Sequence, residues 1–176
     1  MNQTYDDELL ETGEEEDTIS NKYLTFTLGE NSYGIPIAHV RDIIEMQKIA
    51  IVPEMPPYVK GVINLRGKII PVVDMRTRLN MPFREYDNRT CIIVIELKNT
   101  LIGLIVDVVE EVLEILPNAI EPAPHFRGVE AQERYLKGIG KVADKLKIIL
   151  DVERVIYDKD METIQSIETI QKAEKA

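Results

Sequence analysis

The sequence predicts a mainly β fold in which two small five-stranded barrels are related by an internal repeat and followed by a C-terminal helix. Three observations support this prediction. Ile and Val together make up 39 of the 176 residues, and β-branched side chains fit the surface of a sheet better than that of a helix. Short alternating apolar segments are separated by glycine and proline. The two halves of the chain also repeat each other.

The first half contains short extended segments in close succession. The first two alternate between apolar and polar side chains and are joined by a turn that begins at Gly29. The third ends where three prolines interrupt the chain, and the last two are joined at Gly67. We expect these strands at residues 23–28, 33–37, 42–52, 59–66 and 68–75.

The second half repeats this order of segments. A shift of 69 residues places the apolar side chains of residues 24–28 on those of 93–97, and a shift of 77 places residues 58–61 on 135–138. The change of shift implies about eight inserted residues, which we place within 114–134. Two such matches in the same order indicate one structural unit that is used twice.

Each copy is too small to leave a sheet open. An open sheet would expose two unpaired edges, whereas closure into a barrel removes them. We therefore expect a first barrel at about residues 22–80 and a second at about 90–157, and we allow for exchange of strands between them. Two barrels with thin cores should also bury apolar side chains against each other.

The two ends of the chain differ from this body. Residues 1–20 hold eight acidic residues and no Lys or Arg, which accounts for most of the net charge of −10. Such a segment buries too little apolar surface to fold, so we predict a disordered tail that aids solubility or docks to a partner. The helical spacing of apolar residues after Asp151 predicts a helix or tail at 158–176 that packs on the second barrel or binds a partner.

The composition disfavours several classes of function. The acidic chain has no basic patch, so we expect no binding to nucleic acid. No apolar run approaches the roughly 20 residues that span a bilayer, and the N-terminus lacks the features of a signal peptide. We therefore expect a cytoplasmic protein without direct membrane insertion. The single cysteine allows neither an internal disulfide nor a Cys-based metal site.

The residues that could carry catalysis are few and scattered. His39 and His125 lie far apart, and neither has a second metal ligand at a suitable spacing. Cys91 falls within an apolar strand, where a buried and unreactive thiol is expected. The sequence contains neither a nucleophile elbow nor a phosphate-binding loop. We expect a binding module without a metal or other cofactor, with a small-molecule-binding barrel or an unrecognised hydrolase as the alternative from another class.

One stretch, residues 52–79, has features that the repeat does not require. It places Arg66 at the end of a strand, beside Gly67, whereas the second copy has Ala143 at the equivalent position. An arginine suits a fixed carboxylate partner, and Asp42 is the candidate within the chain. The alternative is an ordinary surface ion pair, which contributes about 0–1 kcal/mol.

At these motifs the sequence resembles the CheW family of bacterial chemotaxis coupling proteins. The similarity extends from about residue 22 to 157, and its motifs are YGIPI at 33–37, VRDII at 40–44, GVINLRG at 61–67 and IIPVVD at 69–74. The resemblance implies two Src-homology-3-like barrels without enzymatic activity. It also implies an adaptor that couples transmembrane chemoreceptors to the histidine kinase CheA. Its partners would be the cytoplasmic tip of the receptor and the regulatory domain of the kinase.

The resemblance also implies coupling residues on the first barrel. Positions at which receptor and kinase coupling is sensitive in the family match Val40, Asp42, Gly61 and Arg66, and Asn64 belongs to the same motif. The family commonly has Glu where this chain has Asp42, so the carboxylate side chain is one methylene shorter here.

The resemblance further implies an apolar kinase-binding surface on the first barrel. The candidates are Ile37, Ile44 and Ile49, with packing in the core as the alternative for each. A CheV-type coupling domain, or a stand-alone copy of the regulatory module of the kinase, is the alternative function within the same signalling system.

Overall fold

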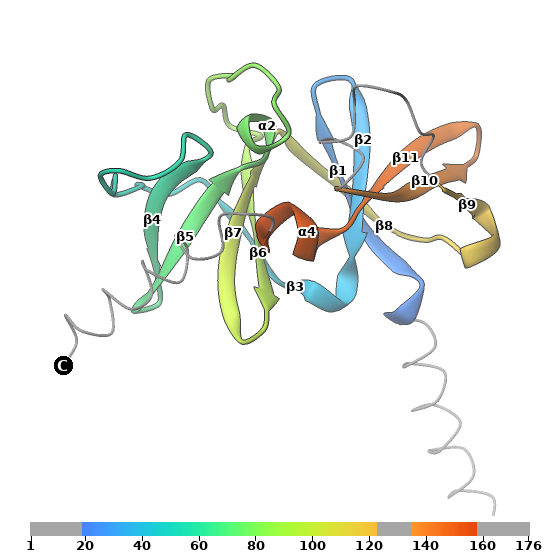
Figure 1. The fold of residues 1–176 in the computed structure, drawn as a ribbon, viewed down its shortest axis with the longest axis horizontal. Helices are drawn as coiled ribbons and strands as arrows, with labels where there is room; N and C mark the ends of the chain where they lie inside the picture. The colour runs from blue at the N-terminus through green and yellow to red at the C-terminus, as the bar shows by residue number, and fades with distance from the viewer. Residues whose placement is uncertain (1–18, 123–134, 158–176) are drawn as a thin grey trace, which may run out of the picture.

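The computed structural model describes residues 19–122 and 135–157, and strands predominate in them. Two sheets lie side by side, and the short helix α4 (Val152–Tyr157) lies between them in Figure 1. The mainly β fold predicted from the Ile and Val content is confirmed.

The five-stranded sheet has the strand order β3-β6-β7-β5-β4. Its strands are β3 (Val40–Glu45), β4 (Val59–Leu65), β5 (Lys68–Asp74), β6 (Cys91–Leu97) and β7 (Thr100–Val106). The one-turn helix η1 (Ile37–His39) leads into β3, and α2 (Met75–Arg78) follows β5. Asp74 caps α2, because its carboxylate accepts a hydrogen bond of 3.1 Å from the backbone N–H of Thr77.

The six-stranded sheet has the order β8-β1-β2-β11-β10-β9. Its strands are β1 (Lys22–Leu28), β2 (Asn31–Pro36), β8 (Val108–Glu114), β9 (Ile120–Glu121), β10 (Leu136–Val142) and β11 (Lys145–Leu150). The turn η2 (Pro117–Ala119) connects β8 to β9. The sixth strand is the two-residue β9, which the sequence analysis did not anticipate because so short a segment carries no alternation.

The two sheets exchange hairpins. The β1–β2 hairpin of the first repeat copy lies in the six-stranded sheet, and the β6–β7 hairpin of the second copy lies in the five-stranded sheet. The exchanged hairpins join through two parallel pairs, β2 with β11 and β5 with β7. The sheets therefore do not follow the continuous ranges 22–80 and 90–157, since each sheet takes strands from both.

The repeat is visible in the strand boundaries. A shift of 69 residues carries β1 onto β6, and a shift of 77 carries β4 onto β10, with identical bounds in both cases. The two copies therefore have the same backbone plan, and the exchange relates them reciprocally.

The strand pairings of neither sheet close a complete barrel. In the five-stranded sheet, the chain after β3 reaches β4 through a single bridge between Ala50 and Val62, with N–O distances of 2.8 and 2.9 Å. In the six-stranded sheet, β9 makes the corresponding contact with β10. Each sheet curves so that the continuation of its first edge strand meets its last strand.

The largest apolar cluster lies between the sheets. It combines inward-facing residues of β1 and β2 with those of β6 and β7, and two smaller clusters fill the individual sheets. Helix α4 buries Val152, Val155 and Ile156 in the cluster between the sheets, so it packs on both copies. The predicted tail at 1–20, except for its last two residues, and the predicted helix at 158–176 lie outside the described residues.

Candidate functional site

Arg66 stands at the tip of the β4–β5 hairpin. Arg66 and Gly67 have φ angles of 52° and 85°, so both central residues of this turn adopt the left-handed region that matches the twist of the paired strands. The side-chain oxygen of Asn64 accepts a hydrogen bond of 2.9 Å from the backbone N–H of Gly67. Asn64 therefore holds the turn, and the turn holds Arg66 away from the sheet.

The structure brings Asp42 and Arg66 together. Nη2 of Arg66 lies 3.4 Å from Oδ2 of Asp42, and the Arg66 side chain is 81% exposed. The other carboxylate oxygen of Asp42 accepts a hydrogen bond of 2.8 Å from the backbone N–H of Ile43. A single long contact on an exposed side chain contributes about 0–1 kcal/mol, so most donors of the guanidinium remain available to a partner.

Gly61 allows two strands to approach closely. Its φ is 145°, and a Cβ atom at this position would lie 2.1 Å from the carbonyl oxygen of Ala50. Any larger residue would therefore break the bridge between Ala50 and Val62. Gly61 acts on the site by shaping the sheet.

The remaining predicted residues lie at least half inside the protein. Val40 caps η1, pairs with Ile95 and packs at the edge of the cluster between the sheets. Ile37 packs against that same cluster, whereas Ile44 and Ile49 pack against the inner cluster of the five-stranded sheet. The structure thus does not bring these three isoleucines into one exposed surface.

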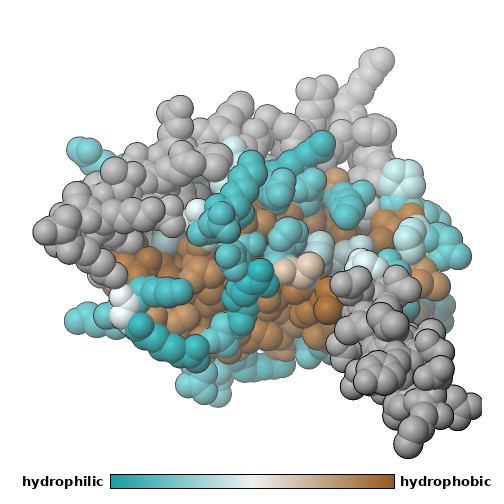
Figure 2. Space-filling model, turned by 90° about the horizontal axis from the view of Figure 1, so that it is seen from below, coloured by the Kyte–Doolittle hydropathy of each residue, from teal (hydrophilic) through white to brown (hydrophobic). Residues whose placement is uncertain are grey.

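Other apolar side chains are exposed on the five-stranded sheet. Ile43 is 42% exposed and Ile51 is 85% exposed. The sequence analysis missed both. Alternation along β3 does not say which of Ile43 and Ile44 faces water, and Ile51 lies beyond the end of β3. Apolar residues also gather in the middle of the face seen in Figure 2, which shows the molecule of Figure 1 from below.

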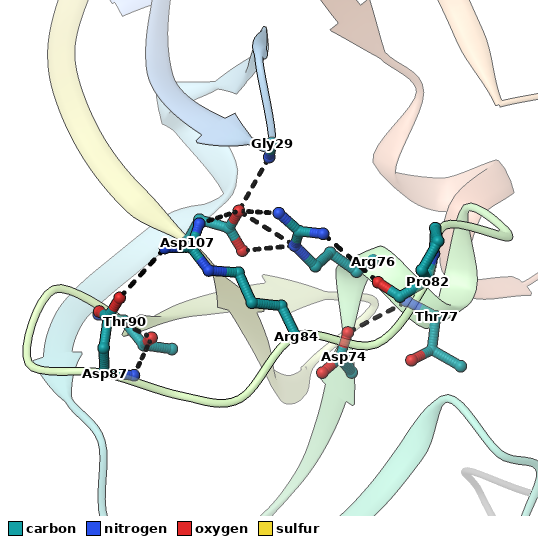
Figure 3. A network of polar contacts seen from close by, with 9 residues as sticks. All are labelled: Gly29, Asp74, Arg76, Thr77, Pro82, Arg84, Asp87, Thr90 and Asp107. Carbon is teal, nitrogen blue, oxygen red and sulfur yellow. Dashed lines mark hydrogen bonds and ion pairs between the residues drawn. The ribbon is translucent and has the colours of Figure 1, made fainter.

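A polar cluster joins the two sheets on the upper side of Figure 1. Asp107, the single residue between β7 and β8, accepts hydrogen bonds of 2.6 and 2.8 Å from the guanidinium of Arg76, as Figure 3 shows. It also accepts one of 2.8 Å from the backbone N–H of Gly29. Burial tends to raise the pKa of Asp107, but these hydrogen bonds and the arginine charges outweigh it and lower the pKa. Asp107 therefore stays charged and ties α2 and the β1–β2 turn to the junction.

The buried side chain of Arg78 contacts residues of both repeat copies. The Nε of Arg78 donates a hydrogen bond of 2.6 Å to the carbonyl oxygen of Val155 in α4. Its guanidinium lies 4.5 Å and 4.8 Å from the ring centres of Tyr58 and Tyr135, which are repeat-equivalent residues. Cation–π contacts of this kind are stronger when desolvated, and Arg78 is 8% exposed.

The chemistry of these groups suits binding better than catalysis. Among residues 19–122 and 135–157, no three His, Cys, Asp or Glu side chains are placed to hold a metal ion. Burial and the nearby Glu45 carboxylate raise the pKa of the Cys91 thiol, which makes it a weak nucleophile at neutral pH. His39 is half-buried in η1, and His125 lies outside the described residues. No helix in the described part of the chain has the length and apolar character to cross a membrane.

Comparison with known proteins agrees with the fold. The model of the CheW-like domain matches residues 22–160. The chain belongs to the CheW family. The chemotaxis protein CheW of Klebsiella aerogenes is 33% identical over 151 residues, which cover 86% of this chain and 90% of that protein. The protein of the same name from Bacillus subtilis is 36% identical over 146 residues, with coverage of 82% and 90%.

A solved structure shows the same fold. The scaffolding protein TtCheW from Thermoanaerobacter tengcongensis superimposes with a TM-score of 0.72 and 36% sequence identity, over 78% of this chain and 93% of that chain. CheW proteins are non-catalytic scaffolds, so this chain is a chemotaxis scaffold protein and not an enzyme. The resemblance to the CheW family inferred from the motifs at 33–74 is confirmed.

Proposed function

We propose that this scaffold protein couples transmembrane chemoreceptors to the histidine kinase CheA. The match of residues 22–160 to the CheW-like domain carries the proposal. The receptor would contribute its cytoplasmic tip and the kinase its regulatory domain. The protein would act in the cytoplasm at receptor arrays, without inserting into the membrane or binding nucleic acid. Each curved sheet would serve as a small Src-homology-3-like barrel that presents one binding face.

The five-stranded sheet supports this proposal with a charged group and apolar side chains. Arg66 is held on a fixed turn with most of its donors free, and Asp42 lies beside it on β3. Ile43 follows Asp42 and is 42% exposed, while Ile51 lies further along the same connection. Exposed apolar and arginine side chains dominate the energetics of protein interfaces. We therefore assign the coupling surface to Asp42, Ile43, Ile51 and Arg66, with Asn64 and Gly61 shaping it and Val40 at its base.

A binding experiment tests the proposal. The purified full chain is mixed with a receptor cytoplasmic fragment, with CheA, or with both, and the complexes are followed by sedimentation velocity. We expect each pair to associate at micromolar concentration and all three proteins to form a larger complex. Failure of the chain to bind either partner at these concentrations would contradict the proposal.

Two matched variants locate the surface. Ile43→Ser should weaken association with at least one partner by about tenfold, since an exposed apolar contact at the centre of an interface is worth about 1–2 kcal/mol. Val112→Ser is the control, because Val112 is the repeat equivalent of Ile43 on β8 and is 48% exposed. Equal loss from both variants would mean that the surface is not confined to the five-stranded sheet.

A further inference from the structure

A hollow at the junction of the sheets is separate from the Arg66 surface. It has a volume of about 440 Å³ and is lined by the six-stranded sheet and by the loop between α2 and β6. Thr27 and Glu110 line it from the six-stranded sheet, and Arg84 and Arg89 line it from the loop between α2 and β6. Asp107 lies between these two sides. A ligand in this hollow would contact the six-stranded sheet and this loop beside Asp107, where the chain passes from one sheet to the other.

The loop that carries the two arginines is held in place by several hydrogen bonds. The hydroxyl of Tyr86 donates a hydrogen bond of 2.6 Å to the carboxylate of Asp74. The carboxylate of Asp87 accepts hydrogen bonds of 2.8 and 3.2 Å from the backbone N–H groups of Arg89 and Thr90. A binding group on a fixed loop loses little conformational entropy when a ligand arrives, so this loop is preorganised for contact.

The carboxylates that line the hollow already have protein partners. Asp107 is bonded to Arg76 and to the backbone of Gly29, as Figure 3 shows. Glu110 accepts a hydrogen bond of 2.6 Å from the hydroxyl of Ser32, and the ammonium of Lys147 lies 3.3 Å from its other oxygen. Asp87 bonds to its own loop. The negative charge in the hollow is therefore largely compensated within the protein.

The two guanidinium groups in the hollow make fewer close contacts with the protein than the carboxylates do. Arg84 is 54% exposed and lies 3.4 Å from Asp87 and 3.5 Å from Asp107, which are long contacts for a guanidinium. Arg89 is exposed, and its side chain makes no hydrogen bond or ion pair with residues 19–122 or 135–157. Each guanidinium has five N–H donors, so the hollow offers donors and positive charge to an incoming group.

We propose that this hollow binds carboxylate side chains from an acidic segment of a partner protein. The planar fork of an arginine matches a carboxylate in two parallel hydrogen bonds, which an ammonium cannot provide. An extended segment can place one carboxylate on each guanidinium from outside. The proposal does not depend on receptor or kinase binding, because the hollow uses none of the residues at the Arg66 turn.

Backbone NMR of the full-length protein tests the proposal with defined probes. The protein is titrated with a hexaglutamate peptide, a hexaglutamine peptide and inorganic phosphate at low salt. We expect saturable shifts of the Thr27, Gly29 and Val108 amides with hexaglutamate only. Arg84→Gln and Arg89→Gln should each raise the dissociation constant about tenfold, because each removes a charge-assisted contact. Lys137→Gln, which removes an exposed charge on β10, is the control and should leave the affinity unchanged.

Each other outcome contradicts the proposal. Equal binding of hexaglutamine would show that carboxylates are not recognised, and equal shifts with phosphate would show a simple anion site. Arg89→Gln decides the case if Arg84→Gln disturbs the loop, because the Arg89 side chain supports no other described residue. A full-length variant with the eight N-terminal acids neutralised should bind as the natural chain does. If only that variant binds hexaglutamate, the occupant is the chain's own acidic segment and not a partner.

Discussion

The two sheets have one backbone plan and different interiors. The inner cluster of the five-stranded sheet is entirely aliphatic and consists of Ile63, Ile70, Val72, Ile92, Val94 and Ile105. The repeat-equivalent residues in the six-stranded sheet are Gly140, Lys147, Ile149, Tyr23, Thr25 and Pro36. The five-stranded sheet therefore has an apolar interior, and the six-stranded sheet has small and polar residues at equivalent backbone positions.

The polar residues of the six-stranded sheet satisfy one another. Lys147 is 4% exposed, and its ammonium donates a hydrogen bond of 2.9 Å to the hydroxyl of Ser32 and lies 3.3 Å from Glu110. The hydroxyl of Thr25 donates a hydrogen bond of 2.7 Å to the carbonyl oxygen of Glu111 at the irregular pairing between β1 and β8. The hydrogen bonds of Lys147 with Ser32 and of Thr25 with Glu111 each join a residue of the first copy to one of the second.

Polar and charged residues that differ between the two sheets also explain how the exchanged topology is specified. Arg41 on β3 forms an ion pair with Glu96 on β6, and the repeat equivalent of Arg41 is Glu110 on β8. Without exchange, β6 would pair with β8 and Glu96 would face Glu110. The opposite charges of Arg41 and Glu96 stabilise the observed pairing, whereas the like charges of Glu96 and Glu110 would destabilise the alternative.

Lys147 supports the same choice of partner strand. In the observed sheet its register partner on β2 is Ser32, whose repeat equivalent on β7 is Leu101. Without exchange, the buried ammonium would lie beside a leucine, which cannot accept a hydrogen bond. Polar residues at the contacts between copies thus specify which hairpin joins which sheet, since the apolar pattern of the two hairpins is nearly the same.

Reciprocal substitutions at one pair of equivalent positions give the largest expected effect. Ile70→Lys places an ammonium in a wholly aliphatic cluster and should lower the free energy of unfolding by about 5 kcal/mol, enough to unfold much of the protein. Lys147→Ile should cost only about 1 kcal/mol, because Glu110 keeps contact with Ser32 and with water. Urea unfolding followed by circular dichroism measures both. Equal losses would mean that the two interiors are equivalent after all.

The fold was predictable from the sequence only up to strand partners. Alternation and turn glycines placed four strands of the first half within two residues, whereas the third, expected at 42–52, ends at Glu45. The shifts of 69 and 77 revealed the two copies. Which copy each hairpin joins depends on contacts such as Lys147 with Ser32, which are 115 residues apart and have no local signature.

The candidate site was predictable in part for the same reason. Asp42 and Arg66 meet, as expected from the preference of an arginine for a carboxylate partner. The clamp between Arg76 and Asp107 was missed, because an isolated Arg and Asp with a spacing of 31 match no motif.

The clamp between Arg76 and Asp107 exists at one of the two junctions only. Its repeat-equivalent positions carry Glu153 and Ala38, which cannot form the pair. Asp107→Asn should lower the free energy of unfolding at pH 7 by about 4 kcal/mol, since it leaves the buried Arg76 uncompensated. Asp42→Asn is the control and should cost less than about 1 kcal/mol, because its pair is exposed.

The same clamp predicts a pH dependence. The pKa of Asp107 is lowered in the folded protein, so its stabilisation is fully present above the ordinary carboxyl pKa of about 3.9 and is lost as the pH falls through the lowered value. The difference between the natural chain and Asp107→Asn should therefore stay constant from pH 7 to about pH 5 and shrink below about pH 4. A difference that is undiminished at pH 2 would show that packing, rather than charge, explains it.

Gly61 and Gly138 lie at equivalent close approaches of strands in the two sheets. An added Cβ would lie 2.1 Å from the Ala50 oxygen at Gly61 and 2.6 Å from the Glu121 oxygen at Gly138, and only Gly61 has a positive φ. Gly61→Ala should lower the free energy of unfolding by about 3 kcal/mol, and Gly138→Ala by about half as much. Thermal denaturation of the two variants measures this, and a larger loss at Gly138 would contradict the geometry.

The hairpin tips give the smallest expected effect on stability. Arg66→Ala should change the free energy of unfolding by less than about 1 kcal/mol, because the side chain is 81% exposed and makes one long ion pair. Lys145→Ala, which removes one exposed charge from the equivalent hairpin of the six-stranded sheet, should do the same. If Arg66→Ala unfolds the protein, the role assigned to Arg66 as a binding residue is wrong.

We expect the coupling of receptor signals to the kinase to depend on Arg66. Autophosphorylation of CheA is measured with receptor fragments present, after addition of the natural chain, Arg66→Ala or Lys145→Ala. The natural chain and Lys145→Ala should stimulate the kinase equally, whereas Arg66→Ala, folded and at the same concentration, should lose most of the stimulation. Full stimulation by Arg66→Ala would contradict the surface assigned here, and no stimulation by the natural chain would contradict its role as the connector between receptor and kinase.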